Sequence, residues 1–207
     1  MTMQTIYLVD NDASGCHKLS CFLENAGYSV RSFPSAESFL EQAKDLAAGV
    51  MLLDQHLAGM SGMELQAELT NRGMHFPIIF FCGQADLQMS VKAIKGGAIN
   101  FLVKPVKNKV LLESVREGTL HVGEMQIRNV LRNRYVNMTN REREVMQHVV
   151  AGMSSKNIAK LLSITERTVE THRSRVMIKM GVKSLPELVR IYYKYSIYGL
   201  SASESAA

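Results

Sequence analysis

The chain has 207 residues, three of them cysteines, and a formal net charge of +5. This length allows one or two domains. No apolar run approaches the ~18 residues that cross a bilayer. Cysteines without metal-ligand spacing, in a chain with no secretory segment, fit a reducing compartment. We therefore expect a cytoplasmic protein that does not enter a membrane.

The charge is divided unevenly along the chain. Residues 1–118 carry 10 Lys and Arg against 12 Asp and Glu, whereas residues 119–207 carry 14 against 7. Basic domains concentrate near polyphosphate backbones, which makes the C-terminal part the candidate for a nucleic-acid partner. A membrane surface or an acidic protein would be the alternative partners of a basic patch.

Short apolar runs alternate with amphipathic stretches over the first half of the chain. Such alternation predicts an α/β fold in which both faces of a five-stranded, doubly wound parallel sheet of flavodoxin-like type are covered. The expected strands lie at residues 5–9, 28–33, 50–53, 77–81 and 99–103. The expected helices lie at residues 13–25, 35–43, 62–71 and 87–96, with another after Asn108.

Polar residues follow the expected strands at their carboxyl ends, where function gathers in such sheets. They are Asp10, Asn11 and Asp12 after the first strand, Asp54 after the third, Cys82 after the fourth and Lys104 after the fifth. Carboxylates from separate strand ends can bind a hard cation such as Mg²⁺. That cation and a lysine can offset the charge of an incoming phosphoryl group while a carboxylate acts as nucleophile. Taken singly, Asp12 could be a helix cap and Lys104 a solvated loop residue.

Residues 1–120 resemble the receiver domain of two-component response regulators, above all in LDQHLAGMSGMEL at 53–65 and GGAINFLVKPV at 96–106. The resemblance implies that Asp54 is the phosphoacceptor and Lys104 its charge partner. It also implies that Cys82 and Phe101 occupy the two switch positions and that the Lys104–Pro105 peptide is cis. The implied metal ligands are Asp10, Asn11, Asp12, Asp54 and the backbone carbonyl of His56.

Three positions depart from the receiver pattern, the first of them Ala58, where a proline usually follows the phosphoacceptor loop. Asn11 stands where the family usually has a second acid, which should weaken Mg²⁺ binding unless Asp12 or water compensates. Cys82 stands where a Ser or Thr hydroxyl usually bonds the phosphoryl oxygen, and its S–H is a weak donor. Two hypotheses follow. Either a histidine kinase phosphorylates Asp54, or a degenerate receiver dimerises or senses another signal without phosphate.

Cys82 also allows a redox interpretation. A nearby Lys104 could lower the pKa of its thiol and make it a sensor. The ordinary interpretation is a small residue of about the size of threonine.

Residues 121–137 are expected to form a linker that is helical in part, within a segment interrupted by Gly118 and Gly123. The basic residues near its end can approach DNA or cap a helix C-terminus. They are Arg128, Arg132 and Arg134.

Helix-start and helix-stop signals are dense in residues 138–198. Thr139 and Ser184 each begin a capping box, closed by Glu142 and Glu187. Further N-caps at Ser154 and Thr165, with stops at Gly152 and Gly181, complete the pattern. The expected helices are 140–151, 155–162, 166–180 and 185–196, and the second and third have the spacing of a helix-turn-helix. The tail, residues 199–207, is expected to be disordered.

The helix expected at 166–180 has two distinct faces. Val169, Val176 and Met180 share the face that would dock on the other helices. The opposite face can hydrogen-bond phosphates and base edges in a major groove, although a merely solvated helix is the alternative. It presents Arg167, Thr171, Ser174, Arg175 and Ile178, with Thr168 and Glu170 on its flanks.

The C-terminal segment resembles the LuxR-type helix-turn-helix of bacterial transcription regulators, in register from Thr139 to Val182. The resemblance places Glu170, Thr171 and Ser174 at base-facing positions. It makes phosphate-contact candidates of Lys156, Thr168, Arg173 and Lys179. These positions and the exposed face of the helix together give the expected set of DNA-binding residues. The set is Lys156, Thr165, Arg167, Thr168, Glu170, Thr171, Arg173, Ser174, Arg175 and Lys179.

The whole chain thus resembles response regulators of the NarL/FixJ class. The expected function is a transcription regulator that binds double-stranded DNA as a homodimer on pseudo-palindromic half-sites. A sensor histidine kinase is the expected input partner, and RNA polymerase is a further candidate partner. We expect no enzyme, because there is no glycine-rich nucleotide loop and no nucleophile–base pair beyond the acidic pocket. The alternatives are a phosphotransfer adaptor or a flavodoxin-like enzyme, since similar sheets host many functions.

Overall fold

The computed structural model describes residues 3–83 and 87–194. They form two compact units, which divide between Glu124 and Met125. The division falls inside helix α5 (Asn108–Val136), in the segment expected to be a linker.

The N-terminal unit is built on one parallel sheet with strand order β2-β1-β3-β4-β5. This confirms the expected fold class. The strands are β1 (Thr5–Val9), β2 (Ser29–Phe33), β3 (Gly49–Leu53), β4 (Ile78–Cys82) and β5 (Asn100–Val103). The helices before α5 are α1 (Ala13–Asn25), α2 (Ala36–Gln42), the 3-10 helix η1 (Ala43–Asp45), α3 (Gly62–Asn71) and α4 (Leu87–Lys95).

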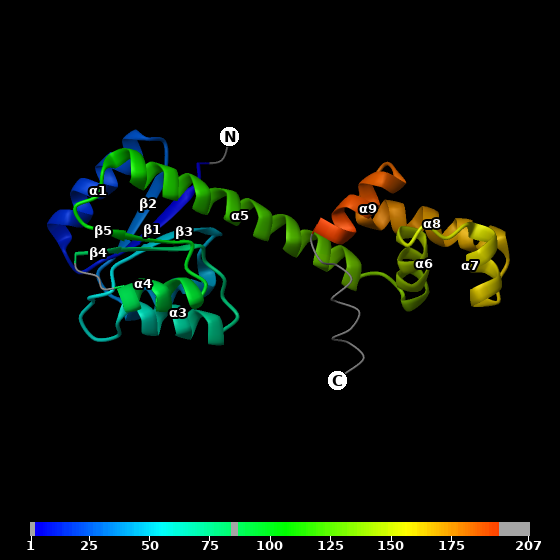
Figure 1. Ribbon diagram of the computed structural model, residues 1–207, viewed down its shortest axis with the longest axis horizontal. Coiled ribbons are helices and arrows are strands. Elements are labelled where there is room, and N and C mark those ends of the chain that lie inside the picture. Colours follow the sequence, from blue (N-terminus) through cyan, green and yellow to red (C-terminus); the bar gives the residue numbers. More distant parts are fainter. Residues whose placement is uncertain (1–2, 84–86, 195–207) are drawn as a thin grey trace. The chain divides into compact units, whose positions relative to one another are not determined.

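Both faces of this sheet are buried, as its apolar strands require. Strand β3 is buried at every residue, which is typical of a central strand in a parallel sheet. On one face Tyr7 and Phe80 pack with residues of α2, α3 and α4. On the other, Leu8 and Leu52 pack with residues of α1 and α5. Figure 1 shows α3 and α4 on one side of the strands and α5 on the other.

Helix α5 runs without a break through Gly118 and Gly123, contrary to the expected interruption. A Cβ atom at Gly118 would lie 2.8 Å from a methyl group of Val50 on β3, so the missing side chain lets the helix approach the sheet. At Gly123 a Cβ atom would meet nothing within 4 Å. Gly118 therefore serves close packing rather than helix termination.

The C-terminal unit is helical. The end of α5 is followed by α6 (Asn140–Val150), α7 (Ser155–Leu162), α8 (Glu166–Met180) and α9 (Leu185–Lys194). Residues from every one of these helices share one core, including Leu131 and Tyr135 of α5. The expected bounds agree with the structure to within one residue for α6, α7 and α8. Residues 195–196 and the tail from 199 lie outside the described residues.

The helix starts follow the capping signals, with one correction. The Thr139 box is confirmed: the Thr139 hydroxyl accepts from the N–H of Glu142 at 3.2 Å, and the Glu142 carboxylate accepts from the N–H of Thr139 at 2.8 Å. The prediction of a capping box at Ser184 is wrong for one of its two hydrogen bonds, the one from the N–H of Ser184 to Glu187. The Ser184 hydroxyl accepts from the N–H of Glu187 at 3.4 Å, but the Glu187 carboxylate accepts from the backbone N–H of Lys183 at 2.9 Å. The carboxylate thus reaches one residue beyond the cap.

Alanine substitutions at the two α5 glycines should differ in their effect on the free energy of unfolding. Gly123→Ala adds a good helix former in open space and should stabilise the fold by about 0.5–1 kcal/mol. Gly118→Ala gains the same helix propensity but pushes on the stiff, β-branched Val50, so it should be less stable than Gly123→Ala by about 1–3 kcal/mol. Thermal unfolding of the full chain, followed by circular dichroism, measures both. Equal melting temperatures would contradict the close packing at Gly118.

Candidate functional site

Two buried carboxylates and one lysine meet at the carboxyl edge of the sheet. Asp10 follows β1, Asp54 follows β3 and Lys104 follows β5, and the two aspartates are only 6% and 8% exposed. The Lys104 ammonium lies 2.6 Å from Asp10 Oδ2 and 2.7 Å from Asp54 Oδ2. The predicted convergence of these three side chains is confirmed.

The backbone holds this arrangement by continuing the sheet pairing past the strand ends. The N–H of Asp54 donates to the carbonyl of Val9 at 2.9 Å, and that of Lys104 donates to the carbonyl of Cys82 at 2.8 Å. Gly62, which begins α3, lies so close that a Cβ atom there would be 2.4 Å from the Asp54 carbonyl oxygen. Only glycine leaves room for this approach.

The lysine is a fixed positive charge at neutral pH. Burial alone would lower the pKa of Lys104, but its hydrogen bonds and charge interactions with Asp10 and Asp54 outweigh burial and raise the pKa. Its ammonium also lies 4.9 Å from the centroid of the Phe81 ring. No sequence pattern singles out Phe81, because this residue stands in an apolar strand run like any core residue.

Of the other expected metal ligands, Asn11 and Asp12 have side chains placed elsewhere, whereas His56 lies beside Asp54. Asn11 is exposed, and Asp12 is the N-cap of α1, accepting from the N–H of Ser14 at 3.1 Å. The His56 side chain is 60% exposed, and its backbone N–H donates to Asp54 Oδ1 at 2.9 Å. Within residues 3–83 and 87–194, no group of three or more His, Cys, Asp and Glu side chains could hold a metal ion.

The remaining donor set still suits Mg²⁺. This ion commonly takes one or two carboxylates from a protein and fills its other positions with water and substrate phosphate. Asp10 and Asp54 supply two carboxylates. Both contact the same Lys104 ammonium, so they lie close enough together to bind one ion.

The two switch positions are apolar in character. Cys82 is fully buried, and burial raises the pKa of its thiol to about 11, more than Lys104 lowers it. This favours the ordinary interpretation of Cys82 as a small buried residue over that of a thiol activated by Lys104. Phe101 is half-buried and stacks on Phe80 with 5.6 Å between the ring centroids. The Lys104–Pro105 peptide is cis, as the resemblance implied.

Helix α8 has the two faces that the sequence predicted. Val169, Val176 and Met180 are buried in the core. The opposite face is exposed, which confirms the helical-wheel prediction. It presents Arg167, Thr171, Ser174, Arg175 and Ile178.

The expected phosphate contacts separate into two groups. Lys156 is exposed on α7. Thr168, by contrast, donates its N–H to the N-cap Thr165 at 3.1 Å, and Arg173 donates to the Ser155 hydroxyl at 2.8 Å. Lys179 lies 2.7 Å from the carboxylate of Glu142. Thr165, Thr168, Arg173 and Lys179 thus all have roles within the unit.

The Lys179–Glu142 pair joins α8 to the first turn of α6. Glu142 is 2% exposed. Burial would raise the pKa of its carboxyl, but hydrogen bonds from Lys179 and Thr139 outweigh burial and lower it. The ionised carboxylate therefore ties two helices together at neutral pH.

Arg134 of α5 caps the C-terminal end of α8, next to Lys179. Its guanidinium donates to the carbonyl of Met180 at 2.6 Å, next to Gly181, which has a left-handed φ of 65°. Of the two roles considered for this basic segment, capping is the one the structure shows for Arg134.

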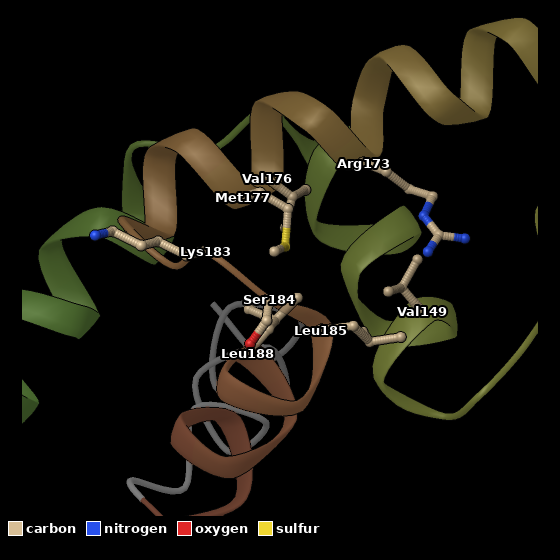
Figure 2. Close-up of a pocket in the computed structure, with 8 residues that line it drawn as sticks. All are labelled: Val149, Arg173, Val176, Met177, Lys183, Ser184, Leu185 and Leu188. Carbon is tan, nitrogen blue, oxygen red and sulfur yellow. The ribbon is translucent and has the colours of Figure 1, made fainter.

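A cavity of about 190 Å³ lies beside the core of the C-terminal unit. Figure 2 shows Arg173 and Val149 at one end, and Lys183 at the other with its ammonium pointing away. The cavity therefore lacks convergent charges around a common centre. Its lining residues are Val149, Arg173, Val176, Met177, Lys183, Ser184, Leu185 and Leu188.

Both units match known families. Residues 6–116 match the response regulator receiver domain, and residues 136–192 match the bacterial regulatory proteins of the luxR family. The transcriptional regulatory protein FixJ of Rhizobium meliloti (strain 1021) is 38% identical over 195 residues, which cover 92% of this chain and 96% of that protein.

Solved structures agree. The response regulator StyR is 37% identical with a TM-score of 0.70, covering 94% of this chain and 100% of that one. Full-length FixJ from B. japonicum is 32% identical with a TM-score of 0.58. The match covers 95% of this chain and 99% of that one. The chain belongs to the response regulators of the NarL/FixJ class, transcription regulators of two-component systems that join a receiver to a LuxR-type DNA-binding domain. In the described part of the chain no helix is long and apolar enough to span a membrane.

The three cysteines should differ sharply in reactivity. Cys21 is exposed, whereas burial raises the pKa of both Cys16 and Cys82 to about 11. At pH 8 we expect a disulfide reagent to modify Cys21 first, and Cys82 only after unfolding, because the thiolate is the nucleophile. Peptide mass mapping over time measures this, with Cys21→Ser removing the fast phase. Modification of Cys82 as fast as Cys21 would restore the redox interpretation.

Proposed function

We propose that a sensor histidine kinase phosphorylates Asp54 and that this modification controls DNA binding by α8. The observation that carries the proposal is the single ammonium of Lys104 bridging two buried carboxylates, at 2.6 and 2.7 Å. In such a pocket the Asp54 carboxylate can act as a nucleophile, and the Lys104 ammonium can offset the negative charge of a phosphoryl group.

In the proposed reaction an oxygen of Asp54 attacks the phosphorus of a phosphohistidine. An O–P bond forms, the N–P bond breaks, and the electron pair goes to the imidazole nitrogen of the kinase. Lys104 stays protonated and can turn from the aspartates towards the phosphoryl oxygens. The backbone N–H of His56, which donates to Asp54 in the structure, lies beside the same carboxylate.

Asp10 and Asp54 would hold Mg²⁺, with the His56 carbonyl as a third candidate and water in place of the acid that Asn11 replaces. The ion would offset the negative charge of the phosphoryl group. With two protein carboxylates instead of three, we expect weak binding that acetyl phosphate or a phosphorylated kinase completes.

The proposed output is DNA recognition rather than turnover of a substrate. The exposed face of α8 would enter the major groove, with Thr171 and Ser174 at base edges and Arg167, Arg175 and Lys156 near phosphates. A homodimer would place two such helices on successive half-sites. We propose that it acts in the cytoplasm and that RNA polymerase is a further partner.

A phosphate-independent receiver is the second candidate. It is favoured by the buried thiol of Cys82, a weak donor where a hydroxyl would bond the phosphoryl group. In that case the N-terminal unit would serve dimerisation or sense another signal.

Phosphorylation decides between the two candidates. With acetyl phosphate and Mg²⁺, intact-mass spectrometry should show one added phosphoryl group on the wild type. Asp54→Asn should show none, because an amide is not a nucleophile here, and EDTA should suppress the reaction. Asp45→Asn is the matched control, since Asp45 lies in η1. An unmodified wild type, with no shift towards dimer under beryllofluoride, would support the phosphate-independent candidate.

Base and phosphate contacts should respond differently to mutation. Thr171→Ala should reduce discrimination between DNA sequences, whereas Lys156→Ala should weaken binding to all of them and reduce the salt slope by about 1. Titrations of a selected and a scrambled duplex at several salt concentrations measure both effects. If the two variants behaved alike, the assignment of base and phosphate contacts would fail.

A further inference from the structure

Three side chains form a closed polar network between α7 and α8. Ser155 stands at the first position of α7, and its hydroxyl donates to Glu170 Oε1. The same hydroxyl accepts from Arg173 at 2.8 Å, and Arg173 lies 3.9 Å from Glu170 Oε1. A long acidic side chain on an exposed helix face is thereby held by two partners.

The network orients Glu170 without covering it. Both contacts use Oε1, and the side chain remains 60% exposed. Glutamate loses considerable rotamer freedom when it is fixed. Because Ser155 and Arg173 restrain it before DNA arrives, Glu170 would lose less of that freedom on binding.

The carboxylate selects among bases by its chemistry, because an ionised carboxylate only accepts hydrogen bonds. In the major groove guanine presents acceptors and thymine an acceptor with a methyl group. Adenine presents a donor beside the acceptor N7, which would face the carboxylate with like polarity. Cytosine offers its N4 amino group as a donor without an adjacent acceptor, so it is the best match.

We propose that Glu170 selects a cytosine in each half-site, and that Ser155 and Arg173 are the positioning residues that aim its carboxylate. This rests on the proposed entry of α8 into a major groove. It also gives Arg173 a role other than the expected phosphate contact: its charge partly offsets that of Glu170 on a surface that approaches DNA.

A purely structural role is the competing explanation, in which Ser155 and Arg173 simply fasten α7 to α8. That role predicts a loss of stability and no change in base preference. Ser154 offers a matched control, because its hydroxyl caps α7 by accepting from the N–H of Asn157 at 3.3 Å. Ser154→Ala removes a cap and leaves the Ser155 hydroxyl in place.

The test is selection of duplexes from a randomised pool by the full-length protein at low salt, followed by sequencing. The wild type should prefer cytosine at one position of each half-site, by about 10- to 100-fold over the other bases. Glu170→Gln should shift that preference to adenine, whose N6 and N7 match an amide. Ser155→Ala and Arg173→Met should reduce the cytosine preference several-fold. Ser155→Thr, which keeps a hydroxyl, should keep the preference, and so should the control Ser154→Ala.

The failures are distinguishable. If the wild type selects no sequence at all, the proposed DNA recognition by α8 fails, and this inference fails with it. If the wild type selects a sequence but Glu170→Gln keeps the same base at every position, only the assignment of Glu170 is overturned. If Ser155→Ala lowers the melting temperature and retains full cytosine preference, the positioning role is overturned.

Discussion

The N-terminal unit depends on one electrostatic constraint: two carboxylates are buried at neighbouring strand ends with a single ammonium between them. Either aspartate buried alone would carry a large desolvation penalty. Lys104 offsets that penalty by contacting both carboxylates, but it comes from β5, two strands away from β3. The strand order and the backbone bonds past each strand end are what bring the three groups to one point. The pocket is left with one more negative than positive side chain, which makes it receptive to a cation.

In the C-terminal unit, too, polar contacts between distant residues hold the functional element in place. Its helix α8 exposes charged and polar side chains on one face while it is fixed to three other helices. Glu142 and Lys179 fasten it to α6, Ser155 to α7 and Arg134 to the last turns of α5. Polar contacts at the rim of the apolar core therefore set the orientation of the exposed face.

Much of this organisation can be predicted from the sequence because its determinants are local. Apolar runs and caps such as Thr139 mark elements to within a residue or two, and the residue after each strand is bound to lie at the sheet edge. Long-range determinants cannot be predicted in this way. Gly118 looks like a helix breaker until Val50 is seen beneath it, and Cys82 looks activated by Lys104 until its burial is known. The contact between Ser155 and Glu170 joins residues on different helices, and no spacing rule anticipates it.

The share of α5 in the second core bears on where the DNA-binding module can be cut. Leu131 and Tyr135 are 5% and 1% exposed, and Arg134 closes the end of α8. A fragment that begins just before Thr139 would lose all three, so it would open the core to water and uncap the C-terminal end of α8. The smallest autonomous fragment must therefore retain the last turns of α5. For the same reason, a protease that cuts within those turns would inactivate the module instead of releasing it.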